Sequence, residues 1–309
     1  MAATEYSTSS NPYPTDIPKP NFIIIGSAKC GTTTLADILD SHPDCCFSRP
    51  KEVNFFNIDS NHTKGWEFYS SAFRHYVSES MVGEATPNYA ALPSQPNCAE
   101  RIYSFNPDMK IIYIVRHPYK KIVSSWKMHC HETPHPAHEA ANIGFEYYIK
   151  YTQEHFNYLD HCLFSYQINA YKKLFPIENI KIIFLEDWSK NSTIEAAKLM
   201  DFLGLDVSRL PSFDPSGSNR AEARKESTKL FQFINQSTPL KVIAKLLPGG
   251  IKQTILNSSI AFKPSSYPPL SISSSYKQAV IDYLKYDAQN FLKDHGKPDS
   301  FWDFHTDNL

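Results

Sequence analysis

The stretch NFIIIGSAKCGTTTL, residues 21–35, decides the fold of this chain. Residues 22–25 form a continuous apolar run without alternation, which is typical of a central parallel strand covered on both faces. Gly26 and Gly31 frame a short turn, and the threonines at 32–34 begin a helix. This arrangement places unpaired backbone N–H groups and the positive end of a helix dipole at one point. The stretch therefore predicts a binding site for an anion, usually a phosphate group.

The spacing of the glycines differs from that of a nucleotide-binding P-loop, G-x-x-x-x-G-K-[ST]. Gly26, Gly31 and Thr32 fit that pattern, but the lysine that should follow Gly31 is missing. A lysine stands earlier instead, at Lys29, so its charge approaches a phosphate from the other side. No residues look arranged to hold a nucleoside triphosphate with Mg²⁺. The alternative is an ordinary strand-to-helix turn, in which Gly and Thr are common.

The composition is that of a soluble globular protein: 309 residues, 41% hydrophobic and 20% charged. The net charge is −1, so no basic field indicates nucleic acid, and any anion site has to be local. The six cysteines include no C-x-x-C pair, which argues against a metal site or a disulfide scaffold. No apolar run approaches the roughly 18 residues that span a bilayer, and the N-terminus does not have the pattern of a signal peptide. We therefore expect no metal, no nucleic-acid partner and no membrane association.

The run KCGTTTL resembles the 5′-phosphosulfate loop of the sulfotransferases, which use 3′-phosphoadenosine 5′-phosphosulfate (PAPS) as donor. The residues that carry this resemblance are Lys29, Cys30, Gly31, Thr32, Thr33, Thr34 and Leu35. The resemblance implies that residues 29–34 hold the 5′-phosphosulfate, with PAPS as cosubstrate and without a metal. Many animal relatives in this family are Golgi membrane proteins. This chain is bacterial in style, and we expect it in the cytoplasm.

Further buried strands are predicted at residues 110–115 (KIIYIV) and 181–185 (KIIFL). The expected fold is therefore α/β, a P-loop-like parallel sheet flanked by helices on both faces, as in the sulfotransferase fold. A ligand would lie at the carboxyl ends of the strands. Helices are expected at residues 145–161, 164–175, 193–203 and 279–292.

The domain organisation is expected to be simple. Residues 1–20 are rich in Ser, Thr and Pro and read as a disordered or loosely ordered arm. Residues 21–309 are expected to form a single sulfotransferase domain, with the C-terminal third as lid and support. Trp302 is expected to act as a packing anchor.

A second phosphate site is indicated where the strand at 110–115 ends. Arg116 follows this strand directly, and Pro118 suits the first turn of the next helix. Arg116 and Ser124, eight residues later, match the family's 3′-phosphate site. An arginine fork at the end of a strand and a hydroxyl two turns into the next helix can converge on one phosphate. An Arg-x-Pro sequence after a strand is also common without any ligand. The spacing of Arg116 and Ser124 and their order along the chain favour the phosphate site.

The segment KEVNFF, residues 51–56, resembles the "KE-x-x-FF" segment of the heparan sulfate and bacterial sulfotransferases, whose glutamate is the proposed general base. The acceptor must lose a proton as it attacks sulfur, and a carboxylate within hydrogen-bond reach can take that proton. Glu52 is therefore the candidate base, and Lys51 could neutralise the sulfonate or orient Glu52. The alternative is a solvated ion pair followed by two core aromatic residues.

Four histidines, at 129, 131, 135 and 138, lie within residues 128–138. Two prolines interrupt this run and no carboxylate or cysteine set completes a metal site, so a loop beside the acceptor pocket is expected. In that case His129 or His131 is the alternative base to Glu52. The segment MVGEATPNY, residues 81–89, resembles the family's "GE-x-TP-x-Y" segment. Some heparan sulfate enzymes have a lysine where this chain has Ala85, which makes a polyanionic glycan acceptor less expected.

These observations together predict an enzyme that moves the sulfuryl group of PAPS to a hydroxyl or amine by in-line displacement, releasing adenosine 3′,5′-bisphosphate. A small-molecule acceptor of specialised metabolism is favoured, with a carbohydrate as the alternative. Arg220, in the polar loop 212–224, is a further candidate for the 3′-phosphate or for the acceptor. Rival hypotheses are a P-loop nucleotide kinase and a nucleotide-binding protein without catalytic activity.

Overall fold

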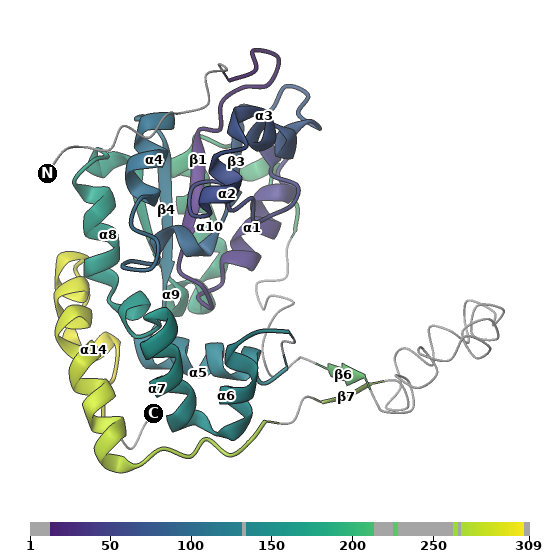
Figure 1. Cartoon of the computed structure of the whole chain (residues 1–309). Coiled ribbons are helices and arrows are strands. Elements are labelled where there is room, and N and C mark those ends of the chain that lie inside the picture. The colour runs from purple at the N-terminus through teal and green to yellow at the C-terminus, as the bar shows by residue number, and fades with distance from the viewer. Residues whose placement is uncertain (1–12, 132–133, 213–224, 228–261, 265–266, 306–309) are drawn as a thin grey trace, which may run out of the picture. The chain divides into compact units, whose positions relative to one another are not determined.

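The computed structural model describes residues 13–131, 134–212, 225–227, 262–264 and 267–305 (Figure 1). Contacts divide the chain into two compact units, Met1–Ser216 with Leu270–Leu309, and Gly217–Pro269. Within the described residues of the second unit, β6 (Lys225–Ser227) and β7 (Phe262–Pro264) form an antiparallel pair. Most of the expected N-terminal arm lies outside the described residues, and the prediction of one domain with a lid stays a prediction.

The first unit is built on a sheet of five strands in the order β2-β3-β1-β4-β5, all paired in parallel (Figure 1). The strands are β1 (Phe22–Gly26), β2 (Cys45–Phe47), β3 (Met81–Ala85), β4 (Lys110–Val115) and β5 (Ile180–Phe184). Residues of β1 alternate between two apolar cores: Ile23 and Ile25 pack on one face and Phe22 and Ile24 on the other. The run has no polar alternation because both faces are covered.

The helices of the first unit are α1 (Thr32–Ser41), α2 (Asp59–His62), α3 (Gly65–Ser70), α4 (Cys98–Phe105), α5 (Pro118–His129), α6 (Ala137–Ile143), α7 (Phe145–Phe156), α8 (Phe164–Lys172), α9 (Leu185–Lys190), α10 (Ser192–Leu203) and α14 (Ser274–Asp294). Residues of α1, α9 and α10 fill the core on one face of the sheet. Residues of α3, α4, α8 and α14 fill the core on the other. The predicted α/β fold with helices on both faces is confirmed.

Close packing between β1 and β3 depends on a glycine. A Cβ on Gly83 would lie 2.3 Å from the carbonyl oxygen of Phe22, so only glycine allows this approach. The two strands pair at the same point, with Phe22 opposite Gly83. Because parallel strands end at the same edge, the segments that follow β1, β3 and β4 lie close together. That edge positions the candidate site.

Element types follow the prediction more closely than element ends do. The helix expected at 145–161 ends at Phe156, because Asn157 takes a left-handed conformation with φ 55° that closes it. The C-terminal helix begins at Ser274, five residues before the predicted start. Trp302 is buried in the core, as predicted. In the part of the chain that the structure describes, no helix is both long and apolar enough to cross a membrane.

Candidate active site

The loop between β1 and α1 has two residues in the left-handed region. Gly31 has φ 100°, and a Cβ there would lie 3.1 Å from the Leu185 methyl carbon Cδ1. Lys29 has φ 67°, a conformation that costs a non-glycine residue roughly 1–2 kcal/mol. Strained backbone of this kind is found at ligand sites, where the surrounding structure holds it in place.

The first turn of α1 faces this loop without a side-chain cap. Its N-cap residue is Gly31, which provides no side-chain acceptor, so the N–H groups of Thr32, Thr33 and Thr34 have no acceptor within the helix. These donors and the positive end of the helix dipole favour an anion. Cys30 is fully buried, and burial raises the pKa of its thiol to about 12. Only the backbone of Cys30 is therefore suited to contact a ligand.

Arg116 lies against the same loop from the end of β4. Its Nη1 donates a hydrogen bond to the carbonyl oxygen of Lys29 at 3.2 Å. Its Nε is buried and has no partner. A buried N–H group without a partner is rare in folded proteins, and a bound anion would satisfy it. The structure thus brings Arg116 and Lys29 together, while Ser124 lies half-buried two turns along α5, and the convergence of Arg116 and Ser124 on one phosphate stays a prediction.

The turn between β4 and α5 is fixed by neighbouring elements. The backbone N–H of His117 donates to Glu186 Oε1 at 2.8 Å, and its ring Nε2 donates to the carbonyl oxygen of Asp303 at 2.7 Å. Burial lowers the pKa of His117 to about 4, so the ring is neutral near pH 7. Pro118 is the first residue of α5, as predicted. These contacts hold Arg116 in register with the loop.

Lys51 and Glu52 lie at the first turn of α1. Lys51 Nζ donates to Thr33 Oγ1 at 3.2 Å and forms an ion pair with Glu52 Oε1 at 3.1 Å. The Glu52 side chain is 44% exposed, so solvent or an acceptor can reach it. Phe55 and Phe56 are buried core residues, which agrees with the structural alternative for that part of the segment. The role of Glu52 as base stays a prediction; what the structure shows is its ion pair with Lys51, whose Nζ also contacts Thr33.

His129 is the last residue of α5 and is buried, so the loop expected over residues 128–138 begins two residues later, at Cys130, and ends where α6 begins at Ala137. Its Nδ1 lies 2.8 Å from the hydroxyl of Tyr148. Burial, with smaller contributions from His135 and Lys29, lowers the pKa of His129 to about 3. The ring is therefore neutral near pH 7, close to the phosphate loop. Among the described residues no group of His, Cys, Asp or Glu has the arrangement of a metal site.

Two buried charged residues in this region had no role assigned from the sequence. Lys121 is 4% exposed, and its Nζ contacts the Cys162 sulfur at 3.4 Å. It precedes Ser124 by three residues on the same helix face, a spacing that could have drawn attention to it. Glu84 is fully buried at the end of β3. Arg220 lies outside the described residues.

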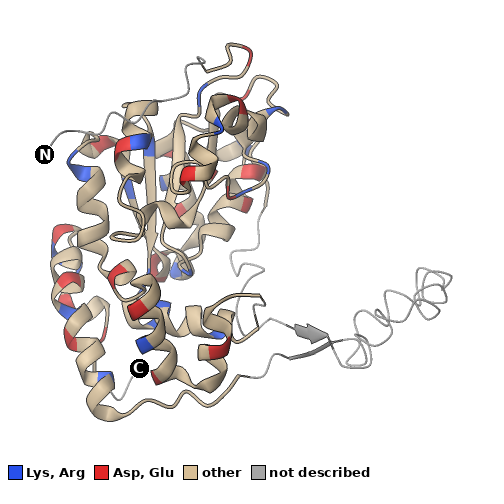
Figure 2. Ribbon diagram, in the orientation of Figure 1, with Lys and Arg blue, Asp and Glu red and all other residues tan. Residues whose placement is uncertain are grey.

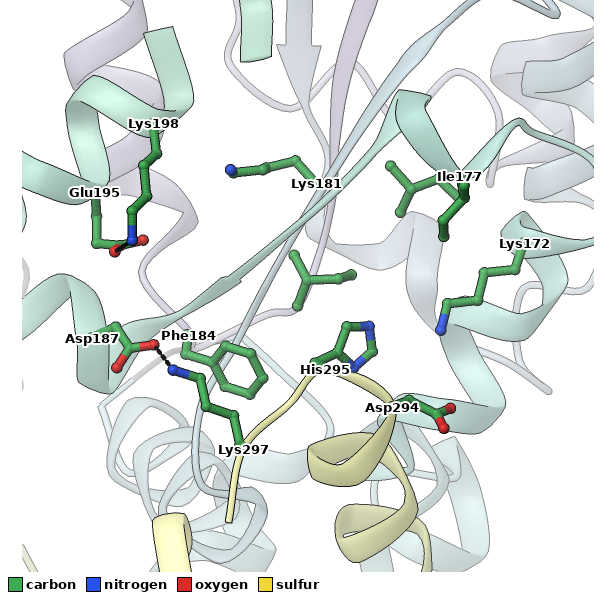
Figure 3. Close-up of a pocket in the computed structure, with 12 residues that line it drawn as sticks. Lys172, Ile177, Lys181, Phe184, Asp187, Glu195, Lys198, Asp294, His295 and Lys297 are labelled. Carbon is green, nitrogen blue, oxygen red and sulfur yellow. Dashed lines mark hydrogen bonds and ion pairs between the residues drawn. The ribbon is translucent and has the colours of Figure 1, made fainter. Parts of the chain in front are cut away.

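A pocket of ≈ 430 Å³ lies elsewhere, along the edge strand β5 (Figure 3). Its rim has two ion pairs, Lys297 with Asp187 at 2.5 Å and Lys198 with Glu195 at 2.7 Å. None of its lining residues belongs to the phosphate loop, α1 or α5. The pocket is therefore separate from the candidate site.

The fold and the site define a protein of the parallel α/β class, with a candidate anion-binding loop after β1 that differs from the P-loop. Comparison with known families is decisive: residues 19–245 match the sulfotransferase domain, and the chain belongs to the sulfotransferase family. It is 36% identical over 110 residues to the membrane-associated sulfotransferase kil1 of Dictyostelium discoideum, covering 35% of this chain and 22% of that protein. It is 26% identical over 187 residues to heparan sulfate glucosamine 3-O-sulfotransferase 6 of Homo sapiens, covering 60% and 52%. The chain thus spans about half or less of the length of these relatives.

Solved structures agree on the fold. The crystal structure of a sulfotransferase from Alicyclobacillus acidocaldarius superposes with a TM-score of 0.61 at 20% identity, covering 93% of this chain and 99% of that one. The predicted family and sulfotransferase fold are confirmed. The sulfotransferase family uses PAPS as its donor, and the residues Lys29 to Thr34 and Arg116 fit such an anionic ligand.

Proposed function

We propose that this chain transfers the sulfuryl group of PAPS to a hydroxyl or amine of a small-molecule acceptor, releasing adenosine 3′,5′-bisphosphate. The observation that carries this proposal is the position of Arg116. It donates to the carbonyl oxygen of Lys29, two residues before the uncapped N-cap Gly31 of α1, and its buried Nε has no partner. Two anion-binding groups at one edge of the sheet suit a nucleotide with phosphates on both the 5′ and 3′ positions.

The donor is held by residues at two points. Lys29 and the N–H groups of Thr32, Thr33 and Thr34 bind the 5′-phosphosulfate, and Arg116 with Ser124 binds the 3′-phosphate. As the acceptor forms its bond to sulfur, the bond from sulfur to the phosphate oxygen breaks and leaves its electron pair on that oxygen. The Lys29 ammonium offsets this developing charge.

Glu52 takes the proton of the attacking hydroxyl or amine. Its half-exposed carboxylate is paired with Lys51, and Lys51 in turn contacts Thr33 in the first turn of α1. We infer that this brings Glu52 near the sulfonate of a donor bound at the loop. Lys51 orients Glu52 and offsets charge on the sulfonate. His129 is the alternative base, but its low pKa makes its ring a weaker proton acceptor than an ordinary histidine.

A small-molecule acceptor is supported by the charge distribution. Along the described elements, Lys and Arg are interspersed with Asp and Glu (Figure 2). The net charge is −1, and Ala85 stands where some heparan sulfate enzymes have a lysine. A carbohydrate acceptor is the second candidate, favoured by the named activity of the heparan sulfate relative. We further propose that the chain acts in the cytoplasm, which its six buried, unpaired thiols support.

Calorimetric titration of the purified chain tests the donor site. We expect adenosine 3′,5′-bisphosphate to bind without Mg²⁺, and ATP with Mg²⁺ to bind at least tenfold more weakly. Tighter binding of ATP that depends on Mg²⁺ would support the nucleotide kinase instead. Substituting Lys198, an exposed lysine of α10, by Ala is a control that should leave both affinities unchanged.

A further inference from the structure

The segment that carries Lys51 and Glu52 is held by side chains of another segment. Its backbone is neither helix nor strand, so the N–H groups of residues 53–56 need acceptors from elsewhere. The Val53 N–H donates to Glu84 Oε2 at 3.4 Å, and the Asn54 N–H donates to Thr86 Oγ1 at 3.2 Å.

The next two donors share one acceptor. The N–H groups of Phe55 and Phe56 both donate to the hydroxyl oxygen of Tyr89, at 3.1 and 3.4 Å. Four consecutive amides are therefore bound by three side chains, Glu84, Thr86 and Tyr89, which lie within six residues at and after the end of β3. We call these three residues the β3 clasp.

Glu84 determines the orientation of the clasp. Its Oε2 accepts from the Thr86 hydroxyl at 2.7 Å, and its Oε1 accepts from the Tyr89 hydroxyl at 2.8 Å. All three side chains are at most 1% exposed. Each hydroxyl donates its one hydrogen to Glu84, so its oxygen is left to accept a hydrogen bond from the amides of residues 54–56. A glutamine at position 84 has only one acceptor oxygen, so it could accept from only one of these two hydroxyls, and the bond from the other would be lost.

The clasp contacts the same segment directly after Lys51 and Glu52. Lys51 is two residues before Val53, and its carbonyl oxygen accepts from the Ala85 N–H at 3.4 Å and from the Ser48 hydroxyl at 2.9 Å. Its Nζ reaches Thr33 at the start of α1. The carbonyl end and the amide end of this short segment are thus both fixed to the end of β3, and Glu52 lies between them.

We propose that Glu84 is a positioning residue, which holds Glu52 against the phosphate loop through the β3 clasp. This inference rests on the proposed role of Glu52 as base. The segments KEVNFF and GEATPNY then form one structural unit, in which side chains of GEATPNY accept hydrogen bonds from the backbone of KEVNFF. Burial also raises the pKa of Glu84 to about 7, against the lowering effect of the bonds from Thr86 and Tyr89.

The test compares Glu84→Gln with Glu67→Gln, an exposed glutamate of α3 outside the site. We expect kcat of Glu84→Gln to fall about 10²-fold, the loss that a displacement of a reacting group by about 1 Å causes. Affinity for adenosine 3′,5′-bisphosphate should change less than about threefold, because the clasp does not contact Lys29 or Arg116. In a Glu52→Ala background, Glu84→Gln should cause no further loss of kcat. Equal losses in kcat and nucleotide affinity, or full additivity with Glu52→Ala, would overturn the proposal.

Hydrogen exchange provides a readout that does not depend on the acceptor. The amides of residues 53–56 should exchange faster in Glu84→Gln than in the wild type and in Glu67→Gln, while amides of β1 and β4 keep their protection. Unchanged exchange at residues 53–56 would refute the clasp. Faster exchange in a protein that transfers no sulfuryl group would keep the clasp and refute the proposed function. Tyr89→Phe, which removes the acceptor of Phe55 and Phe56, gives the same comparison if Glu84→Gln does not fold.

Discussion

Replacing Arg116 by methionine should separate the two phosphate sites. The arginine provides a buried Nε without a partner and a fork that can make two charge-assisted bonds to a 3′-phosphate. Each bond of this kind contributes roughly 1.5–3 kcal/mol. The variant should therefore bind adenosine 3′,5′-bisphosphate about 10²-fold more weakly, which corresponds to about 3 kcal/mol. The hydrogen bond from Arg116 to the carbonyl oxygen of Lys29 contributes less, about 1 kcal/mol, and supports the loop itself.

The assay is calorimetric titration with two nucleotides at one salt concentration. Adenosine 5′-monophosphate has no 3′-phosphate, so its affinity should fall less than about fivefold in Arg116→Met, the share due to loop support. Arg49→Met is the matched control, since Arg49 is exposed and lies 3.9 Å from Asp40. Equal losses for both nucleotides would show that Arg116 acts only through the loop. No loss for either would refute its place in the site.

Three further predictions concern the same region. Lys29→Ala should lower kcat with PAPS roughly 10²-fold or more in a steady-state sulfation assay; an unchanged kcat would remove Lys29 from the reaction. Gly31→Ala should cost about 1–2 kcal/mol in urea unfolding, because the residue has φ 100° and little room for a Cβ; a stabilised variant would contradict the geometry. Burial lowers the folded-state pKa of His129 to about 3, so below pH 6.5 the unfolded chain binds a proton that the folded ring does not. The stability from the neutral ring is therefore present above pH 6.5 and is lost as pH falls from 6.5 towards 3. Between pH 7.5 and 5.5 the wild type should lose about 1.4 kcal/mol more than His129→Gln, and equal losses would show that the ring is not buried as a neutral group.

The fold could be predicted because its signals are local. The apolar run at residues 22–25 indicated a strand covered on both faces, and β1 is the central strand of the sheet. The end of α7 was missed because it depends on one residue, Asn157, taking a left-handed conformation. Aromatic residues continue beyond that point, so the helical pattern extends further than the helix.

Part of the candidate site could also be predicted, because it follows from where the parallel strands end. Parallel strands end at one edge, so a ligand was expected at the ends of the strands, and the structure places Arg116 after β4 in contact with Lys29 after β1 at that edge. The role of Glu84 could not be read in this way. It lies in the buried strand MVGEA, and its partner Val53 belongs to a chain segment whose approach only the folded structure shows.

Sulfuryl transfer itself is the most direct test of the proposed function. The purified chain would be incubated with sulfur-labelled PAPS and a panel of phenols, alcohols, amines and oligosaccharides, with sulfated products detected by mass spectrometry. We predict a labelled product on at least one small-molecule acceptor, formed roughly 10²-fold more slowly by Glu52→Ala. A chain that binds adenosine 3′,5′-bisphosphate but transfers label to no acceptor, or a Glu52→Ala variant as fast as the wild type, would contradict this account.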